Sequence, residues 1–281
     1  MASTTKIMTC IVVIENADLN AEVKVSAKAA GTGGSRLGLK KDDKITIKDL
    51  LYGLMLRSGN DAAVALAEYV GKDKEGFANL MNKKAKELGL KDTHFVTPHG
   101  LDRDAHYTTA LELAKITDYA LKNPKIAQVV STREYTVTIN GNKKIISNTN
   151  ELLGYLSGVN GVKTGYTSKA GRCLVTSTSR DGFDIITVVL GADTKKIRTS
   201  DSIKLIEYTY KNYELVDLRE VVKEEFEAWR KINEKRINVY KGVKQTLVTT
   251  LGELQYTKYP IAKDCANNIW ADINSRDYFE A

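Results

Sequence analysis

Serine and lysine stand three residues apart at the start of the chain, in the segment Ser3-Thr4-Thr5-Lys6. Residues three apart lie on one face of a helix, so the Ser3 hydroxyl and the Lys6 amine can be neighbours. A serine hydroxyl is a poor nucleophile at neutral pH, but an adjacent lysine can act as its base when burial or nearby positive charge lowers the lysine pKa. The apolar run Ile7–Ile14 would supply that burial. On spacing alone, a capping serine beside a solvated lysine is the commoner arrangement.

Two further short motifs offer polar groups for a reaction. In Ser58-Gly59-Asn60, the serine could relay a proton, and the asparagine amide could bind a substrate carbonyl or hold Lys6. In Lys163-Thr164-Gly165, the lysine is a cationic partner, the threonine offers a hydroxyl to a carboxylate, and the glycine leaves room for a substrate backbone. Taken singly, Ser58-Gly59-Asn60 is also an ordinary helix break, and Lys163-Thr164-Gly165 is also an ordinary strand.

The elements that must position these motifs begin with helices. Apolar side chains on nearly every side predict a central helix over residues 3–15, followed by a strand over 22–29. Capping pairs and stop signals then predict a helical block over residues 47–122, with helices at 47–56, from Asn60 or Asp61 onward, at 74–88, and at 110–122, where Asn123-Pro124 ends the last. The glycine-rich loop at 31–35 lacks a phosphate-binding ending and is given no nucleotide role.

Strand patterns dominate later in the chain. Strands are predicted over 133–147 with a turn at Asn140-Gly141, over Val162 to Tyr166, and over 173–179 and 183–190 around Arg180-Asp181-Gly182; a helix follows at 199–212. The order predicts an α/β fold of the α+β type, an antiparallel sheet flanked by helices with a helical subdomain. Residues 216–281 change character, with a helical pattern near Phe226 and strands over 237–257, and are assigned to a separate small domain.

The composition of the 281 residues is that of a globular protein, with 42% hydrophobic and 27% charged residues. The net charge of +7 arises entirely from residues 1–215, which hold 31 basic and 24 acidic side chains against 11 of each in 216–281. A basic domain suggests an anionic partner, and no nucleic-acid motif accompanies it. No apolar run is long enough for a membrane span, and three scattered cysteines make neither a disulfide framework nor a zinc site.

In combination, the three motifs resemble the signature of penicillin-recognising serine enzymes. The segments Met1–Thr9, Leu56–Ala63, Phe95–Thr109 and Gly161–Gly171 closely resemble the low-molecular-weight D-alanyl-D-alanine carboxypeptidases over residues 1–215. The resemblance implies a β-lactamase/transpeptidase-like fold with a small, here partial, β-rich C-terminal domain. It implies removal of the terminal D-alanine from peptidoglycan stem peptides without a cofactor or metal, inhibition by β-lactams, and a place in the cell envelope.

The same resemblance assigns the site residues. Ser3 is the acylated nucleophile, Lys6 its base and Ser58 a proton relay, with Asn60 beside them. The substrate-binding residues it implies are Asn60, Lys163, Thr164, Gly165, Tyr166 and Arg198. Backbone N–H groups of Ser3 and Tyr166 would form the oxyanion hole, and Arg198 would lie near the terminal carboxylate of the substrate. A solvated arginine at the start of a helix is the alternative for Arg198.

Two other functions fit parts of the sequence. A class A-like β-lactamase shares the nucleophile, the lysine and Lys163-Thr164-Gly165, but has Ser-Asp-Asn and a deacylating Glu-x-x-Leu-Asn segment that we do not find between Asn60 and Lys163. A truncated, non-catalytic fragment that binds cell-wall peptides is the other. Because only Met1 and Ala2 precede Ser3, we expect the sheet-completing strands, a signal peptide and a membrane-anchoring segment to belong to a longer protein.

The remaining reactive side chains have simpler interpretations. His94, His99 and His106 are close in sequence, but their spacing matches no zinc pattern, so a structural role is expected. Cys10 could be a thiol nucleophile, but it lies within the apolar helix, where a thiol is normally inert.

Overall fold

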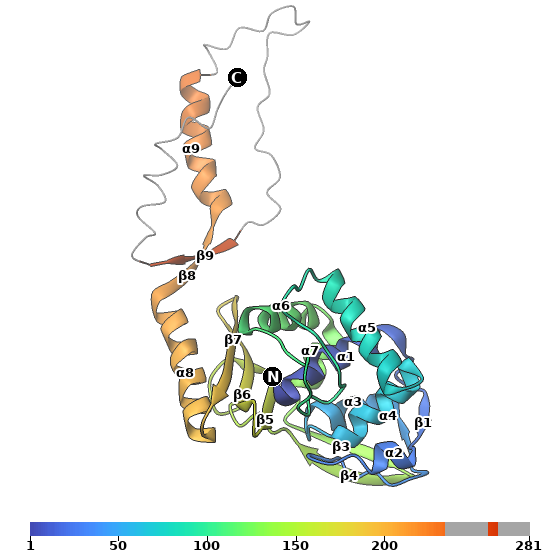
Figure 1. Ribbon diagram of the computed structural model, residues 1–281. Coiled ribbons are helices and arrows are strands. Elements are labelled where there is room, and N and C mark those ends of the chain that lie inside the picture. Colours follow the sequence, from blue (N-terminus) through green and yellow to red (C-terminus); the bar gives the residue numbers. More distant parts are fainter. Residues whose placement is uncertain (234–257, 264–281) are drawn as a thin grey trace, which may run out of the picture. The chain divides into compact units, whose positions relative to one another are not determined.

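The computed structural model describes residues 1–233 and 258–263, and the chain divides into two compact units, Met1–Ile206 and Glu207–Ala281 (Figure 1). The helices are η1 (Ala2–Thr5), α1 (Lys6–Asn16), α2 (Ala27–Ala30), α3 (Ile47–Met55), α4 (Asn60–Gly71), α5 (Lys74–Glu87), α6 (Ala110–Leu121), α7 (Pro124–Ser131), α8 (Lys195–Asn212) and α9 (Leu218–Asn233). The strands are β1 (Glu22–Lys24), β2 (Lys44–Thr46), β3 (Glu134–Ile139), β4 (Asn142–Ser147), β5 (Val159–Thr167), β6 (Gly171–Arg180), β7 (Phe183–Ala192), β8 (Tyr213–Asp217) and β9 (Lys258–Ala262). The predicted division into residues 1–215 and 216–281 stays a prediction.

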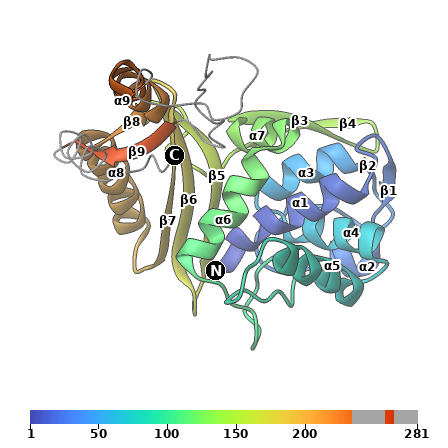
Figure 2. The same ribbon diagram turned by 90° about the horizontal axis from the view of Figure 1, so that it is seen from above.

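The first unit is built on an antiparallel sheet with the order β5-β6-β7. The β6–β7 turn lies at Asp181 and Gly182, which both take positive φ, as a tight hairpin turn requires. Helices α1 and α6 lie on one side of this sheet and α8 on the other (Figure 2). The predicted mixed fold, an antiparallel sheet flanked by helices with a helical subdomain, is confirmed.

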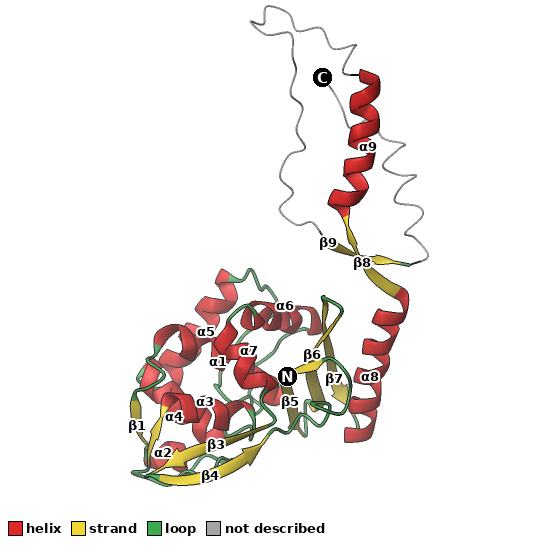
Figure 3. Cartoon of the chain, turned by 180° about the vertical axis from the view of Figure 1, so that it is seen from behind, coloured by secondary structure: helices red, strands yellow, loops and turns green. Residues whose placement is uncertain are grey.

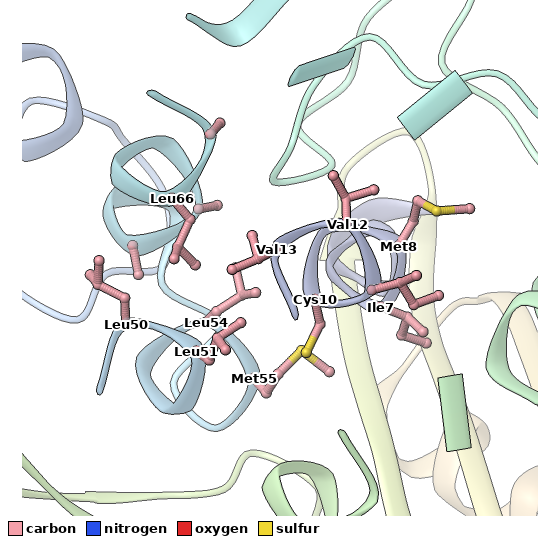
Figure 4. Close-up of a cluster of buried hydrophobic side chains, with 14 of the residues drawn as sticks. Ile7, Met8, Cys10, Val12, Val13, Leu50, Leu51, Leu54, Met55 and Leu66 are labelled. Carbon is pink, nitrogen blue, oxygen red and sulfur yellow. The ribbon is translucent and has the colours of Figure 1, made fainter. Parts of the chain in front are cut away.

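The central helix α1 has no solvent-exposed face along most of its length, because every residue from Lys6 to Val13 is buried. Its apolar side chains pack against Leu51, Leu54 and Met55 of α3 in a cluster that also includes Leu66 of α4 (Figure 4). At roughly 1.5–3 kcal/mol for each buried large aliphatic side chain, this packing holds α1 firmly in place. The end of α1 that carries Lys6 is therefore fixed from all sides.

The helical block continues through α3, α4 and α5, with the β3–β4 hairpin alongside α3 (Figure 3). The predicted capping pairs are present at α3, where the Thr46 hydroxyl accepts from the Asp49 N–H, and at α6, where Thr109 accepts from Glu112. The predicted hairpin turn at Asn140-Gly141 joins β3 to β4. Tyr135 of β3 stacks on Tyr52 of α3 and thereby ties the hairpin to the block.

Two local predictions are wrong and one is incomplete. The strand expected over 22–29 stops at Lys24, because Ser26 caps the short helix α2 by accepting from the Ala29 N–H. Asn123-Pro124 does not only end α6 but also begins α7, since proline suits the first position of a helix and Asn123 caps it. Neither Asn60 nor Asp61 caps α4; Gly59 occupies that position.

The second unit contains β8 paired antiparallel with β9, and helix α9. The helical pattern predicted near residue 226 is confirmed, and Phe226 stacks on Trp229 within α9. The strands predicted over 237–257 lie outside the described residues. Among the described helices, none has the combination of length and apolar character that a bilayer crossing needs.

Asp61 anchors the loop before β2 instead of capping a helix. Its carboxylate is fully buried and accepts hydrogen bonds from the backbone N–H groups of Leu37 at 2.8 Å, Gly38 at 2.8 Å and Leu39 at 3.0 Å. A buried carboxylate is tolerated when its oxygens are satisfied in this way. Asp61 directly follows Asn60, so this anchoring also fixes the start of α4.

Replacing Asp61 by asparagine should lower the free energy of unfolding by about 2–4 kcal/mol. The amide keeps one acceptor but turns an NH₂ group toward the N–H groups of Gly38 and Leu39, so two donors face each other. Urea unfolding followed by circular dichroism measures the change. Asp118→Asn is the matched control: it removes an exposed ion pair with Lys122 and should cost less than about 1 kcal/mol. Equal losses in the two variants would contradict the anchoring role.

Candidate active site

The Lys6 amine lies at the centre of a hydrogen-bonded group. Its Nζ is 2.9 Å from Ser3 Oγ, 2.7 Å from Asn60 Oδ1 and 2.7 Å from the carbonyl oxygen of His99. Asn60 Oδ1 and the His99 carbonyl can only accept, so they take two N–H groups of the amine. A neutral amine has two hydrogens and one lone pair, and the lone pair is then left facing the Ser3 hydroxyl. The two acceptors therefore orient Lys6 to accept the proton of Ser3.

The surroundings of Lys6 favour this neutral form. Lys6 is fully buried, and burial is the largest cause that lowers its pKa well below the ordinary value. The positive charge of Lys163 lowers the pKa further, while the negative charge of Asp61 opposes the change. Burial and a like charge are the two effects that convert a lysine into a base near neutral pH. The predicted pair of Ser3 and Lys6 is therefore brought together, in the environment that its chemistry needs.

Asn60 and Ser58 flank this group from the start of α4. Asn60 uses both ends of its amide, since Oδ1 accepts from Lys6 and Nδ2 donates to the Gly33 carbonyl at 2.7 Å. Of the two roles considered for it, holding Lys6 is the one that its contacts in the structure fill. Ser58 is buried and has a φ of 58°, a strained conformation for a residue other than glycine. Its hydroxyl makes no hydrogen bond within the part of the chain that is described, so its proton relay stays a prediction.

The strand β5 carries Lys163-Thr164-Gly165 past the nucleophile. A Cβ atom on Gly165 would lie 3.0 Å from the Ser3 backbone nitrogen, so only glycine lets the strand lie this close to Ser3. Lys163 is buried, its Nζ donates to the Thr164 carbonyl at 2.9 Å, and burial followed by the charge of Arg198 lowers its pKa to about 7. The Thr164 hydroxyl pairs with that of Thr149 at 2.8 Å. The strand edge beside Ser3 therefore carries a titratable cation.

Tyr166 and Arg198 complete the predicted set. The Tyr166 ring is half-exposed, and the Arg172 guanidinium lies 3.7 Å from the ring centroid. The Tyr166 backbone continues β5 directly after Gly165. Arg198 is 4% exposed, so the solvated alternative is wrong. Its Nη2 donates to Glu151 Oε1 at 2.9 Å and to the Thr199 hydroxyl at 3.1 Å. Sequence reasoning missed Glu151, because no local pattern connects it with an arginine 47 residues away.

A second group of hydrogen bonds supports the turn that carries Ser3, and it involves His106, for which a structural role was expected although its partners were not. Val96 N–H donates to His106 Nδ1 at 2.9 Å, so the proton of the ring is on Nε2, which donates to the Thr5 hydroxyl at 2.9 Å. The Thr5 hydroxyl in turn donates to the Ala2 carbonyl at 2.8 Å. Ala2 directly precedes Ser3 and has a φ of 47°. The chain of bonds from His106 therefore fixes the peptide that carries the nucleophile.

The histidines in this region should make stability depend on pH. Burial lowers the pKa of His106 to about 4 and that of His99 to about 3, against about 6.5 in the unfolded chain. The unfolded chain therefore binds more protons between pH 6.5 and 4, so the free energy of unfolding should fall as the pH falls through that window. His106→Gln should have a shallower fall in urea unfolding at stepped pH. Parallel curves for the two proteins would refute this.

The two alternative chemistries considered for these side chains find no support in the geometry. His99 Nδ1 accepts from the Leu101 N–H at 3.2 Å, and the His106 ring makes the hydrogen bonds described above. No three His, Cys, Asp or Glu side chains gather into a metal-binding group within residues 1–233 and 258–263. Cys10 is fully buried, and burial raises the pKa of its thiol to about 12, which keeps it protonated and inert.

The sequence of this chain is similar to those of known proteins. The family model for D-alanyl-D-alanine carboxypeptidases, peptidase S11, matches residues 1–194. The D-alanyl-D-alanine carboxypeptidase DacF of Bacillus subtilis is 40% identical over 219 residues, which cover 76% of this chain and 56% of the relative. The matched part thus spans little more than half the length of that curated relative.

Solved structures agree with the sequence match. The crystal structure of the Streptomyces K15 DD-transpeptidase superposes with a TM-score of 0.70 at 38% identity, covering 74% of this chain and 86% of that one. The D-alanyl-D-alanine carboxypeptidase DacD from Francisella tularensis superposes with a TM-score of 0.72 at 33% identity, covering 77% and 66%.

Proposed function

This chain belongs to the peptidase S11 family of serine-type D-alanyl-D-alanine carboxypeptidases, and from that membership we propose that it removes the terminal D-alanine from peptidoglycan stem peptides through an acyl-enzyme on Ser3. The observation that carries the proposal is the orientation of Lys6. Two fixed acceptors, Asn60 Oδ1 and the His99 carbonyl, direct the remaining position of its amine toward Ser3 Oγ.

The reaction begins when Lys6 Nζ accepts the hydroxyl proton of Ser3. Ser3 Oγ then forms a bond to the carbonyl carbon of the penultimate D-alanine, and the backbone N–H groups of Ser3 and Tyr166 stabilise the negative charge on the carbonyl oxygen. The C–N bond breaks as the Lys6 ammonium returns its proton, through the Ser58 hydroxyl, to the departing amine. Water, deprotonated by the same lysine, hydrolyses the ester and regenerates Ser3.

The substrate lies along β5 in this proposal. Gly165 lets β5 pass close to Ser3, so a peptide backbone along the strand would lie beside the nucleophile, and Thr164 and Arg198 would receive its terminal carboxylate. Lys163, buried beside the site, adds positive charge. The cationic partners suit a peptide that ends in a free carboxylate. We place the protein in the cell envelope, where such peptides occur, and propose β-lactams as acylating inhibitors.

Intact-mass spectrometry after incubation with benzylpenicillin tests this function. We expect a stoichiometric, long-lived adduct that maps to Ser3 and is absent in Ser3→Ala, and release of D-alanine from a stem pentapeptide. Rapid turnover of a chromogenic β-lactam without a lasting adduct would indicate a β-lactamase instead. No adduct in a chain that circular dichroism shows to be folded would indicate a non-catalytic peptide-binding fragment.

A further inference from the structure

The carboxylate of Glu151 stands directly against the buried guanidinium of Arg198. Glu151 Oε1 accepts from Arg198 Nη2 at 2.9 Å and from the Thr199 hydroxyl, and Oε2 forms an ion pair with Lys195. The Arg198 side chain is 5% exposed and that of Glu151 is 33% exposed. Arg198 is therefore neutralised from one side by a carboxylate that belongs to the chain itself.

Several contacts hold Glu151 in this place. The neighbouring Asn150 side chain donates to the Gly161 carbonyl of β5 at 2.9 Å, and its oxygen accepts from the Leu152 N–H. Thr149 pairs with Thr164 of the same strand. The segment that carries Glu151 is thus fastened to the strand that carries Lys163-Thr164-Gly165, so Glu151 has little freedom to leave Arg198.

The contacts also leave part of Arg198 unused. Both bonds to Glu151 and Thr199 come from Nη2, while Nε is buried and finds no partner among the described residues. A buried donor without a partner is costly, and in a native structure it calls for an explanation. A guanidinium can donate from more than one edge, so Arg198 keeps hydrogen-bonding capacity that Glu151 does not use.

Glu151 is charged at neutral pH. Burial alone would raise its pKa, but hydrogen bonds from Lys195 and Thr199 and the charge of Arg198 outweigh burial and lower the pKa below its usual range. The charge of Arg198 also reaches Lys163, whose pKa it helps to lower. A negative charge at Glu151 therefore offsets part of the positive potential that Arg198 and Lys163 create for an anion beside them.

We propose that Glu151 is a specificity-determining residue that acts as an internal counter-anion to Arg198 and limits how strongly the site prefers ligands with a free terminal carboxylate. The inference rests on the proposed function in placing that carboxylate near Arg198. Without Glu151, the buried guanidinium would have no counter-charge of its own and would hold any carboxylate more tightly, the released D-alanine included. With Glu151, Arg198 keeps its orientation while its attraction for anions is reduced.

Glu151→Gln isolates the charge from the geometry. The amide oxygen still accepts from Arg198 Nη2 and has the same length, but the negative charge is gone. In a Ser3→Ala background, which prevents turnover, NMR titrations give the dissociation constants of N-acetyl-D-alanyl-D-alanine and of its C-terminal carboxamide. The readout is the ratio of the amide constant to the acid constant. We expect Glu151→Gln to raise this ratio about threefold or more, with the acid binding tighter and the amide unchanged.

Two further variants make the test decisive. Glu22→Gln removes an equal charge from an exposed pair with Lys44 on β2 and should leave the ratio unchanged. Glu151→Asp keeps the charge but draws it away from Arg198, and should raise the ratio to an intermediate value; it decides the matter if Glu151→Gln does not fold.

The outcomes separate this inference from the proposed function. A ratio that falls or rises less than threefold in Glu151→Gln overturns the inference, and so does an equal loss of affinity for both ligands, which would mean general damage to the site. Binding of neither ligand by the Ser3→Ala protein overturns it as well. The penicillin adduct on Ser3 of the wild-type chain is measured separately and decides only the proposed function.

Discussion

Replacing Lys6 by methionine should lower the rate constant for acylation of Ser3 by about 10³-fold, the usual contribution of a positioned general base. Methionine keeps the unbranched, apolar stem that packs within α1 but cannot accept the Ser3 proton. Asn60 Oδ1 and the His99 carbonyl each lose a donor, while the burial of an amine is relieved, so the two effects on stability oppose each other. We therefore expect a folded protein in which Ser3 is acylated very slowly.

Stopped-flow measurement with a chromogenic β-lactam gives the acylation rate constant. Lys48→Met is the matched control, since Lys48 is an exposed lysine on α3, and it should acylate like the wild type. In the wild type the rate should rise with pH until Lys6 is fully neutral, and the lowered pKa places that rise at lower pH than for an ordinary lysine. Acylation of Lys6→Met within tenfold of the wild type would mean that another group accepts the proton.

The local parts of this site are those that the sequence predicts best. Ser3 and Lys6 belong to one helical turn, and their contact follows from a spacing of three residues. The capping hydroxyls of Thr46 and Thr109 are likewise set by neighbours three residues on. Asn60 is intermediate, because its type indicated a role beside Lys6 but only the folded chain selects between binding substrate and holding the lysine.

The long-range parts could not be predicted, because their partners are brought together only by the fold. The glycine-rich loop at 31–35 reads as a flexible connection, yet the Gly33 carbonyl accepts from Asn60 Nδ2 and so helps to orient the amide that holds Lys6. Glu151 looks like a surface residue until Arg198 is placed against it. In both cases a short polar segment has a function that no periodicity or spacing marks.

Some predictions are incomplete or wrong because a single residue can serve two structural purposes. Pro124 disfavours helix at the residue before it, which ends α6, but it is also well suited to begin α7. Asp61 stands where a capping residue is expected, but its carboxylate satisfies the loop at 37–39 instead. A sequence pattern indicates that such a residue lies at the boundary of a helix. The packing around it decides which segment of the chain it stabilises.

Substitution of Gly100 by alanine is also expected to have a large effect, on both stability and acylation. It has a φ of +85°, and a Cβ atom there would lie 1.8 Å from the Ala2 carbonyl oxygen and 2.7 Å from the Thr5 hydroxyl. The first distance is far inside any real contact and involves backbone, so the turn before Ser3 would have to move. Gly100→Ala should therefore destabilise the protein and misplace its nucleophile together.

A control variant separates the steric clash in Gly100→Ala from the cost of placing alanine in a left-handed backbone conformation. Gly89 has a φ of +69° with no atom within 4 Å of its would-be Cβ, so Gly89→Ala measures the cost of a left-handed alanine alone, about 1 kcal/mol. We expect Gly100→Ala to lose about 3 kcal/mol more in urea unfolding, and its folded fraction to acylate about 10²-fold more slowly, because a displacement near 1 Å has that effect on an attacking atom. If both variants lost the same stability and kept the wild-type acylation rate, the support of Ser3 by Gly100 would be refuted. If Gly100→Ala lost stability but not rate, the turn at Ala2 would adjust without moving the nucleophile, and the alignment of Ser3 would then depend on Lys6 and β5 rather than on the segment behind it.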